Sequence, residues 1–452
     1  MVATEREHEV NLVRRSAVFI SCLFLCLMSC SFALDEADKG LVAHHYAEYE
    51  QMLHELSVTH ADIVELRTIG YSAGDESRPI YAMKITDNPS TEENEPELQL
   101  VGGIHGDEQI SSYVMLSLAN YLLDQYHNSD DRIVRLVDGY EIHIIPVANP
   151  HGFVHDSRCN ADDVDINRNF SWAWIPGETH GAEAFDQPES TALMEDAYEH
   201  TYVLSIGGHS GDECISFPWD YIGTTLSLGY PSEYSVDTFT RSFLPAYPLL
   251  SGISEEYTRI IHENGNTNFR AIEGFDWYPA FGTMQDWMYG ERGSLALTIE
   301  FHDAKGIRGV NSALYRDVWL EQREAMLQLM EIYENGLHGT VSDGQTGVPL
   351  DACIYVEPTG SKSAADPRET IHFCLTDSDV GDFHLLAQSG FYDITVTADG
   401  YRSAVIANIQ LDSESATTIE VELFPGASEA TLSRLQSPRV EVPSGYVERR
   451  SE

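Results

Sequence analysis

Short apolar runs alternate with amphipathic stretches over most of the chain. Residues 46–56 and 109–126 carry apolar side chains at the spacing of a helix. Runs of strand length, rich in β-branched and aromatic residues, lie between and after these stretches, at 80–85, 98–104, 142–147, 202–206 and 295–301. From about residue 38 to 333, this alternation predicts a sheet that is covered by helices.

The pattern changes after a further helical stretch at 317–334. Strand-like runs then follow one another with turn signals between them, at 339–341, 352–356, 392–398 and 418–423. These runs predict a small all-β sandwich. Residues 426–452 are polar with scattered Pro and Gly, and we expect them to form a disordered tail. A length of 452 residues suits two or three domains.

The first residues have the pattern of an export signal. Arg14 and Arg15 precede an apolar run over 17–28, and small residues stand at the positions that determine cleavage after Ala33. We expect a signal peptide over 1–33 and a secreted or periplasmic mature chain with no transmembrane segment. Residues 27–30 resemble a lipoprotein box, which leaves lipid anchoring at Cys30 open.

The cysteines beyond the signal are Cys159, Cys214, Cys353 and Cys374. Disulfides persist in an exported chain, so the pairs Cys159–Cys214 and Cys353–Cys374 are expected. Four buried thiols are the alternative, because four cysteines allow three connectivities and the sequence does not choose among them.

Charge limits the class of partner. The chain carries 73 acidic and 26 basic residues, a formal net charge of -47. Each contact to a phosphate backbone needs Lys or Arg, so we expect no nucleic-acid partner. A field of this sign attracts cationic ligands, but adaptation to a salty medium would produce the same composition.

Reactive side chains follow the predicted strands at the points where these end. The run at 98–104 leads into His105 and Glu108, the run at 202–206 leads to His209, and the last run contains Glu300. In open α/β sheets, ligands bind at the carboxyl ends of the strands. The sequence therefore predicts that these four side chains meet at one edge of the sheet.

Two histidines and one carboxylate suit a catalytic zinc ion. His105, Glu108 and His209 would supply three ligands and leave a fourth position for water. A carboxylate beside that water takes its proton and later passes it to a leaving amine, the role we assign to Glu300. In the loop at 165–170, Arg168 offers a guanidinium fork for a carboxylate, with Asn167 as a second donor.

Together these segments resemble the zinc carboxypeptidases of the A/B type, from about residue 38 to 333. The motifs are Gly103-Ile104-His105-Gly106-Asp107-Glu108, Asn149-Pro150-His151-Gly152-Phe153, Asp165-Ile166-Asn167-Arg168-Asn169-Phe170, Met284-Gln285-Asp286-Trp287 and Thr298-Ile299-Glu300. The resemblance implies an α/β catalytic domain over 34–334, with a mixed, mostly parallel sheet flanked by helices. It also implies action on the C-termini of peptides or proteins, and we expect the protein to be a monomer.

The resemblance also implies a role for each site residue. One Zn²⁺ per chain would be bound by His105, Glu108 and His209, with Glu300 as the general base. At the matching positions, Arg158 would polarise the scissile carbonyl, and Asn167 and Arg168 would hold the substrate carboxylate. Tyr278 would close over the substrate, and Asp165 would accept a hydrogen bond from the far nitrogen of His105.

Within the family, the chain is most similar to the carboxypeptidase N/E/D subgroup, on Trp277-Tyr278-Pro279 and Met284-Gln285-Asp286-Trp287. A transthyretin-like β domain follows the catalytic domain in that subgroup, which matches residues 335–425. The subgroup prefers C-terminal Lys or Arg, and Asp220 and Gln285 match its pocket residues. An apolar substrate side chain in this pocket would leave the buried carboxylate without a partner, which disfavours the binding of such a substrate.

Some residues depart from the subgroup pattern. His209 is followed by Ser210-Gly211-Asp212-Glu213, which adds acids that either reinforce basic selectivity or reshape the pocket. His151 replaces an Asp in a turn. We expect no regulatory propeptide, because few residues separate the signal from the first helix. The alternatives are a zinc amidohydrolase of the same fold, acting on cell-wall peptides or acylated amino acids, and a catalytically silent binding relative.

Overall fold

The computed structural model describes residues 46–221, 246–306, 312–359, 372–412 and 415–426. The expected signal peptide with Cys30, and residues 427–452 of the expected tail, lie outside these ranges. Within the described part of the chain, no helix is both long and apolar enough to cross a membrane.

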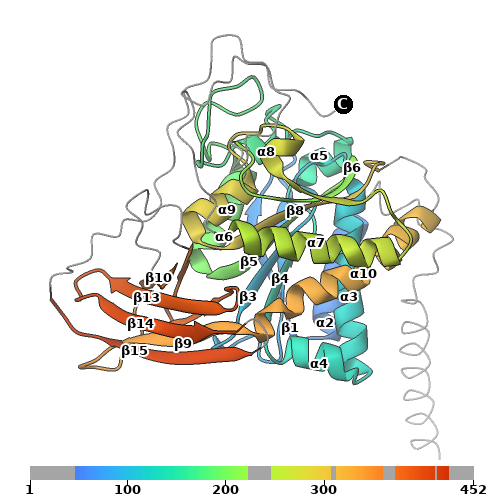
Figure 1. Ribbon diagram of the computed structural model, residues 1–452. Coiled ribbons are helices and arrows are strands. Elements are labelled where there is room, and N and C mark those ends of the chain that lie inside the picture. Colours follow the sequence, from blue (N-terminus) through green and yellow to red (C-terminus); the bar gives the residue numbers. More distant parts are fainter. Residues whose placement is uncertain (1–45, 222–245, 307–311, 360–371, 413–414, 427–452) are drawn as a thin grey trace, which may run out of the picture.

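An eight-stranded sheet lies at the centre of the larger part of the molecule, with strand order β1-β2-β4-β3-β5-β8-β6-β7 (Figure 1). The central strands β4, β3, β5 and β8 are parallel to one another, whereas β2 joins β1 and β4, and β6 joins β8, in antiparallel pairs. The mixed, mostly parallel arrangement is therefore confirmed. The strands are β1 (Val64–Tyr71), β2 (Pro79–Ile85), β3 (Glu97–Val101), β4 (Glu141–Ile145), β5 (Tyr202–His209), β6 (Asp212–Phe217), β7 (Arg270–Glu273) and β8 (Leu295–His302).

Helices cover both faces of this sheet. Helices α3 (Gln109–His127), α7 (Tyr247–Glu263) and α10 (Ser312–Glu331) pack on one face, and α6 (Pro188–Glu199) and α9 (Met284–Arg292) lie on the other (Figure 1). Every residue of β3, β4 and β5 is buried, as expected for strands that are covered on both faces. The shorter elements are α2 (Tyr46–Thr59), α4 (Asp131–Val137), α5 (Pro150–His155), α8 (Gly274–Trp277), η1 (Ile166–Arg168) and η2 (Ile332–Glu334).

The chain leaves the sheet earlier after β3 than the apolar run suggests. The predicted strand at 98–104 ends at Val101 in the structure. Gly103 adopts a φ of 59°, which an L side chain rarely does, and the backbone turns out of the ladder there. This turn carries His105 beyond the sheet edge instead of into the core.

A β-sandwich follows η2. Strands β12-β9-β15 form one sheet and β11-β10-β13-β14 form the other. Residues of both sheets share one apolar core, among them Leu337, Val341, Ile354 and Ile394. The predicted all-β sandwich is thus confirmed. Its strands are β9 (Gly336–Asp343), β10 (Ala352–Pro358), β11 (His372–Leu375), β12 (Asp382–Leu385), β13 (Gly390–Ala398), β14 (Ala404–Leu411) and β15 (Ala416–Leu423).

The sandwich contacts the larger part of the molecule beside α9. Gly293 ends that helix with a φ of 73°, and an added Cβ there would lie 2.8 Å from the ring of Phe373. Nearby, the Thr201 hydroxyl donates to the carbonyl of Thr376 at 3.3 Å. The two parts therefore meet through both apolar packing and a polar contact.

The expected disulfides are wrong. No disulfide joins Cys159, Cys214, Cys353 and Cys374. Strands β10 and β11 place Cys374 opposite Ile354, one position away from Cys353. Because side chains alternate along a strand, Cys374 enters the sandwich core and Cys353 joins a separate cluster on the outer face. Cys214 is fully buried within β6.

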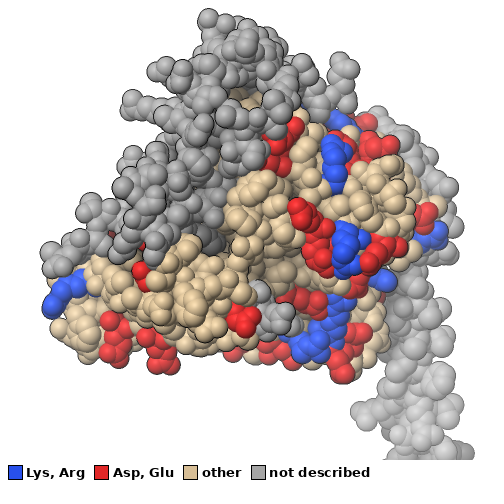
Figure 2. Space-filling model, in the orientation of Figure 1, with Lys and Arg blue, Asp and Glu red and all other residues tan. Residues whose placement is uncertain are grey.

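Charged side chains of both signs share the described surface. Figure 2 shows acidic and basic side chains together over α7 and α10. Arg132, for example, pairs with both Glu324 and Glu331 of α10, at 2.9 and 2.5 Å. The excess of acids is thus partly compensated by local ion pairs on this face.

Candidate active site

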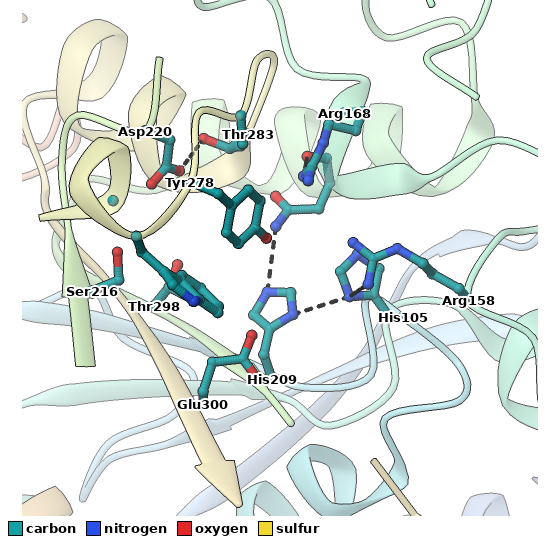
Figure 3. A pocket seen from close by; sticks show the side chains of 14 residues that line it. His105, Arg158, Arg168, His209, Ser216, Asp220, Tyr278, Thr283, Thr298 and Glu300 are labelled. Carbon is teal, nitrogen blue, oxygen red and sulfur yellow. Dashed lines mark hydrogen bonds between the residues drawn. The ribbon is translucent and has the colours of Figure 1, made fainter. Parts of the chain in front are cut away.

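His105, Glu108 and His209 meet at the carboxyl edge of the sheet, and Figure 3 shows the two histidine rings side by side. The Nδ1 atoms of His105 and His209 lie 3.1 Å apart, and each is within 3.0 Å of an oxygen of Glu108. All three side chains are buried. Their donor atoms therefore converge on one point, as the sequence predicts.

A carboxylate sets the tautomer of His105. Asp165 Oδ1 lies 3.0 Å from Nε2 of this ring and accepts its proton, which leaves a lone pair on Nδ1 facing His209. Asp165 Oδ2 accepts from Arg158 Nε at 2.9 Å. Although burial opposes ionisation, Arg158 and His105 hold the pKa of Asp165 well below its usual value. Asp165 is therefore an anion that orients His105.

The donor set fits a divalent cation. The two imidazole nitrogens lie 3.1 Å apart in a buried place, beside a carboxylate. Their lone pairs repel one another unless a proton or a cation lies between them. Two His and one Glu are also the ligands that zinc binds in open catalytic sites. The residues present therefore fit the metal that the motifs imply.

Another buried group with the same residue types is less suited to a metal. Glu97, His143 and His200 also lie close enough together to offer three ligands. Here, however, Glu97 begins β3 and His200 stands two residues before β5, so the group lies toward the amino ends of the parallel strands. None of its three members lines the cavity that His105 and His209 line, which makes it less suited to a catalytic metal.

Two glycines let the backbone segments of the site approach each other. A Cβ on Gly106 would lie 1.9 Å from the carbonyl carbon of Gly152, so neither segment has room for a side chain there. Asn149 caps the helix of the second segment, α5, by accepting from Gly152 N at 2.8 Å, and Pro150 begins it. This packing explains why both motifs contain glycine.

Arg158 borders the ligand group. Its Nη1 lies 3.1 Å from His105 Nδ1 and 3.1 Å from Glu108 Oε1. The guanidinium is thus held between Asp165 and the ligand group, and it places positive charge beside the cavity.

Glu300 lies next to His209 across the β5–β8 pair. Its side chain is 7% exposed, and Oε2 makes no hydrogen bond to the described residues. Burial, reinforced by Glu108, raises the pKa of Glu300 well above its usual value. A buried carboxylate without a partner is costly, so its position indicates a functional role.

The loop at 165–170 brings Arg168 and Asn167 into the cavity wall, and Asn167 Nδ2 lies 3.4 Å from His209 Nε2. Arg168 Nη1 donates to the carbonyl of Asn167 at 2.8 Å, and Arg168 also bonds to the side chain of Tyr278. Asp165 caps η1 by accepting from Asn167 N at 3.0 Å, which fixes this loop. Figure 3 shows Tyr278 pointing into the cavity.

Asp220 lies at the end of the cavity away from the ligand group (Figure 3). It accepts from Thr283 Oγ1 at 2.7 Å and from Gln285 Nε2 at 2.9 Å. Burial raises the pKa of Asp220 to about 6. The Oε1 atom of Gln285 is buried and makes no hydrogen bond to the described residues, which leaves an unused acceptor behind this end of the cavity.

Most of these groups line one cavity (Figure 3). Of the predicted site residues, Glu108, Asp165 and Gln285 lie behind the lining and contact it. Sequence reasoning missed several lining residues, although Thr298 could have been found because it shares a strand face with Glu300. The lining is formed by His105, Arg158, Asn167, Arg168, His209, Ser216, Asp220, Gly274, Trp277, Tyr278, Ala280, Thr283, Thr298 and Glu300.

The sequence of this chain is similar to those of known carboxypeptidases. Carboxypeptidase SOL1 of Arabidopsis thaliana is 29% identical over 387 residues, which cover 84% of this chain and 72% of that protein. Carboxypeptidase E of Caenorhabditis elegans is 26% identical over 450 residues, or 90% and 91% of the two chains. Mouse carboxypeptidase D is 27% identical over 409 residues, 86% of this chain, but the match spans only 27% of that longer protein.

Solved structures with the same fold include carboxypeptidases. Bovine thrombin-activatable fibrinolysis inhibitor, solved with a tick carboxypeptidase inhibitor, has a TM-score of 0.53 at 21% identity, over 64% of this chain and 96% of that one. Carboxypeptidase A of Helicoverpa armigera has a TM-score of 0.51 at 21% identity, over 64% and 72%. At these identities the likeness concerns the fold.

The family assignment follows from the match of a whole domain. The sequence profile of the zinc carboxypeptidase family matches residues 49–323, which include every candidate site residue described above. The resemblance seen in the motifs is thereby confirmed. The chain belongs to the zinc carboxypeptidase family, and it is a metallocarboxypeptidase.

Proposed function

We propose that this metallocarboxypeptidase binds one zinc ion and removes C-terminal residues from peptides or proteins, with a preference for Lys and Arg. The observation that carries the proposal is the composition of one cavity. A three-residue ligand group and Glu300 stand at one end, and Asp220 stands at the other. A metal-assisted hydrolysis and a cationic side chain can thus be accommodated together.

His105, Glu108 and His209 would hold the zinc ion, in the tautomer that Asp165 sets for His105. Zinc, when bound, supplies Lewis acidity at a water molecule and at the scissile carbonyl. The protein supplies the remaining chemistry. Glu300, which has a raised pKa and an unpaired Oε2, would take a proton from the attacking water and give it to the leaving amine.

Arg158 would assist at the carbonyl. Its guanidinium borders the ligand group and stays fixed through Asp165, so it offers a hydrogen-bond donor where negative charge develops on the carbonyl oxygen. A donor that is already held in place needs no reorganisation during the reaction.

Arg168 and Asn167 would bind the terminal carboxylate of the substrate. Arg168 is 5% exposed and lines the cavity, and a guanidinium fork binds a carboxylate with two parallel hydrogen bonds. Tyr278, which contacts Arg168, would cover the bound residue. This arrangement explains exopeptidase action, because an internal residue has no carboxylate to offer.

Asp220 and Gln285 would select the side chain of the last residue. Asp220 provides a negative charge in the cavity lining that suits a long cationic side chain, and Gln285, behind the lining, would orient this carboxylate by donating to it at 2.9 Å. An apolar side chain would leave these groups buried and unpaired, which costs about 1–3 kcal/mol or more. The same pocket argues against the amidohydrolase alternative, whose substrates need no cation site.

The proposed function also includes the location, the oligomeric state and the C-terminal domain of the protein. We propose that residues 1–33 are a signal peptide, that the mature chain is secreted or periplasmic, and that it acts as a monomer. We also propose that residues 335–425 are a transthyretin-like domain that supports the catalytic domain, which agrees with the two-sheet sandwich.

A panel of short peptides that differ in the last residue tests the proposal. Each peptide is offered with a free and with an amidated C-terminus, in the presence and absence of a zinc chelator. We expect release of the last residue from the free peptides alone, fastest for Arg and Lys, and loss of the activity with the chelator. Cleavage of amidated peptides at the same rate would contradict the exopeptidase assignment.

A further inference from the structure

An ion pair at the rim of the cavity involves one of the extra acids that follow His209. Arg270 is the first residue of β7 and Asp212 the first of β6. Arg270 donates to both oxygens of Asp212, at 2.9 and 2.7 Å. Bidentate pairs of this kind fix both partners in position. Asp212 is therefore already paired with a cation of the protein.

Asp212 has a further partner in the cavity wall. The side chain of Trp277 forms a hydrogen bond to Asp212, and since the indole nitrogen is a donor only, Trp277 donates. Trp277 lines the cavity, and its ring lies 4.6 Å from that of Tyr278. Arg270, Asp212 and Trp277 thus form a chain of contacts that ends beside the residue proposed to cover the substrate.

We propose that Arg270 and Asp212 are positioning residues that hold Trp277, and through it Tyr278, in place over the bound substrate. This inference rests on the proposed function, because it concerns the role given to Tyr278. We call Arg270, Asp212 and Trp277 the rim clamp.

The local structure shows why a clamp is useful at this position. Strand β7 lies at the edge of the sheet and has four residues, and α8 is a single turn that ends at Trp277. Two backbone bonds, from Phe275 N to Trp219 O and from Ala280 N to Asp220 O, hold the segment at the pocket end. These bonds hold the backbone on either side of Trp277 and Tyr278, whose side chains line the cavity.

The position of Tyr278 determines which kinetic constant should change. Its side chain contacts Arg168, the proposed carboxylate ligand. The rim clamp therefore acts on substrate binding, and its loss should raise KM while kcat changes little. A contribution of one or two hydrogen bonds corresponds to an increase in KM of about three- to tenfold.

Steady-state kinetics on a peptide that ends in Arg test the clamp. The variants are Arg270→Gln, Asp212→Asn, Trp277→Phe and the double variant Arg270→Gln/Trp277→Phe. We expect each single variant to raise KM about three- to tenfold with kcat within about twofold of wild type. The double variant should resemble the single ones, because both changes break the same chain of contacts.

Arg259→Gln is the matched control. Arg259 forms ion pairs with Glu256 and Glu263 on α7, away from the cavity lining, and its removal should leave both constants unchanged. An unchanged KM in folded Asp212→Asn and Trp277→Phe, a fall in kcat alone, or additive effects in the double variant would each overturn the clamp. If Arg270→Gln does not fold, Trp277→Phe, which keeps an aromatic ring, decides the question. An inactive wild-type enzyme would instead contradict the proposed function.

Discussion

His209 and Glu300 are direct neighbours across the parallel pair of β5 and β8. Both strands end at the same edge of the sheet, so residues that are far apart in the sequence stand side by side there. The pairing brings a proposed zinc ligand next to a proposed general base without any contribution from a flexible loop. Its rigidity makes the roles of the two residues separately testable.

Glu300→Gln should reduce kcat by about 10²- to 10⁴-fold, because an amide cannot take the proton of the attacking water. Zinc content should stay at one ion per chain, since Glu300 is not among the proposed ligands. Turnover and metal content are measured on the same preparation. Near-normal turnover in a fully loaded sample would remove Glu300 from the mechanism.

His209→Ala should lower both zinc content and activity, because it takes away one of three proposed ligands. His302→Ala is the matched control. His302 belongs to a partly exposed group with Glu213 and Asp303 that also has the spacing of a metal site. Metal analysis after dialysis should show loss in the first variant and retention in the second, and the reverse result would place the ion elsewhere.

Asp220→Ala should slow the hydrolysis of peptides ending in Arg or Lys far more than that of peptides ending in Phe or Leu. A hydrogen bond to a charged group contributes about 1.5–3 kcal/mol, so the ratio of kcat/KM values should fall roughly 10- to 100-fold. Both substrates are compared in one enzyme preparation, which cancels errors in active concentration. A constant ratio would remove Asp220 from the selectivity pocket.

The preference for basic residues should also depend on pH. Burial raises the pKa of Asp220 to about 6, so the free enzyme carries a neutral acid below this pH and a carboxylate above it. The ratio of kcat/KM for an Arg peptide to that for a Phe peptide should therefore rise as pH increases through about 6. Glu300 and the metal affect both substrates alike, so the ratio isolates Asp220. A ratio independent of pH between 5 and 8 would contradict this assignment.

The part of the site that the sequence predicted is the part built on regular strands. The apolar runs before His105, at His209 and around Glu300 placed these residues at one sheet edge, and the structure brings them together. Fully buried parallel strands produce long apolar runs, which makes them easy to recognise.

The missed parts lie at the sheet margins. Strands β6 and β7 mix charged and apolar residues because the first residues of each are half exposed, so neither has a simple pattern. The contact of Asp212 with Arg270 and Trp277 joins segments that no periodicity relates. The predicted disulfide between Cys353 and Cys374 failed for a similar reason, since it depended on a strand register that the sequence does not contain.

Helix α9 connects the selectivity pocket with the β-sandwich. Gln285 stands in its first turn, and Gly293, just beyond its last residue, packs against Phe373. A truncated enzyme that stops at residue 334 would lose this contact, because Phe373 belongs to the removed sandwich. Such a fragment should bind basic peptides more weakly than the full-length enzyme, so the sandwich belongs to the smallest unit worth expressing.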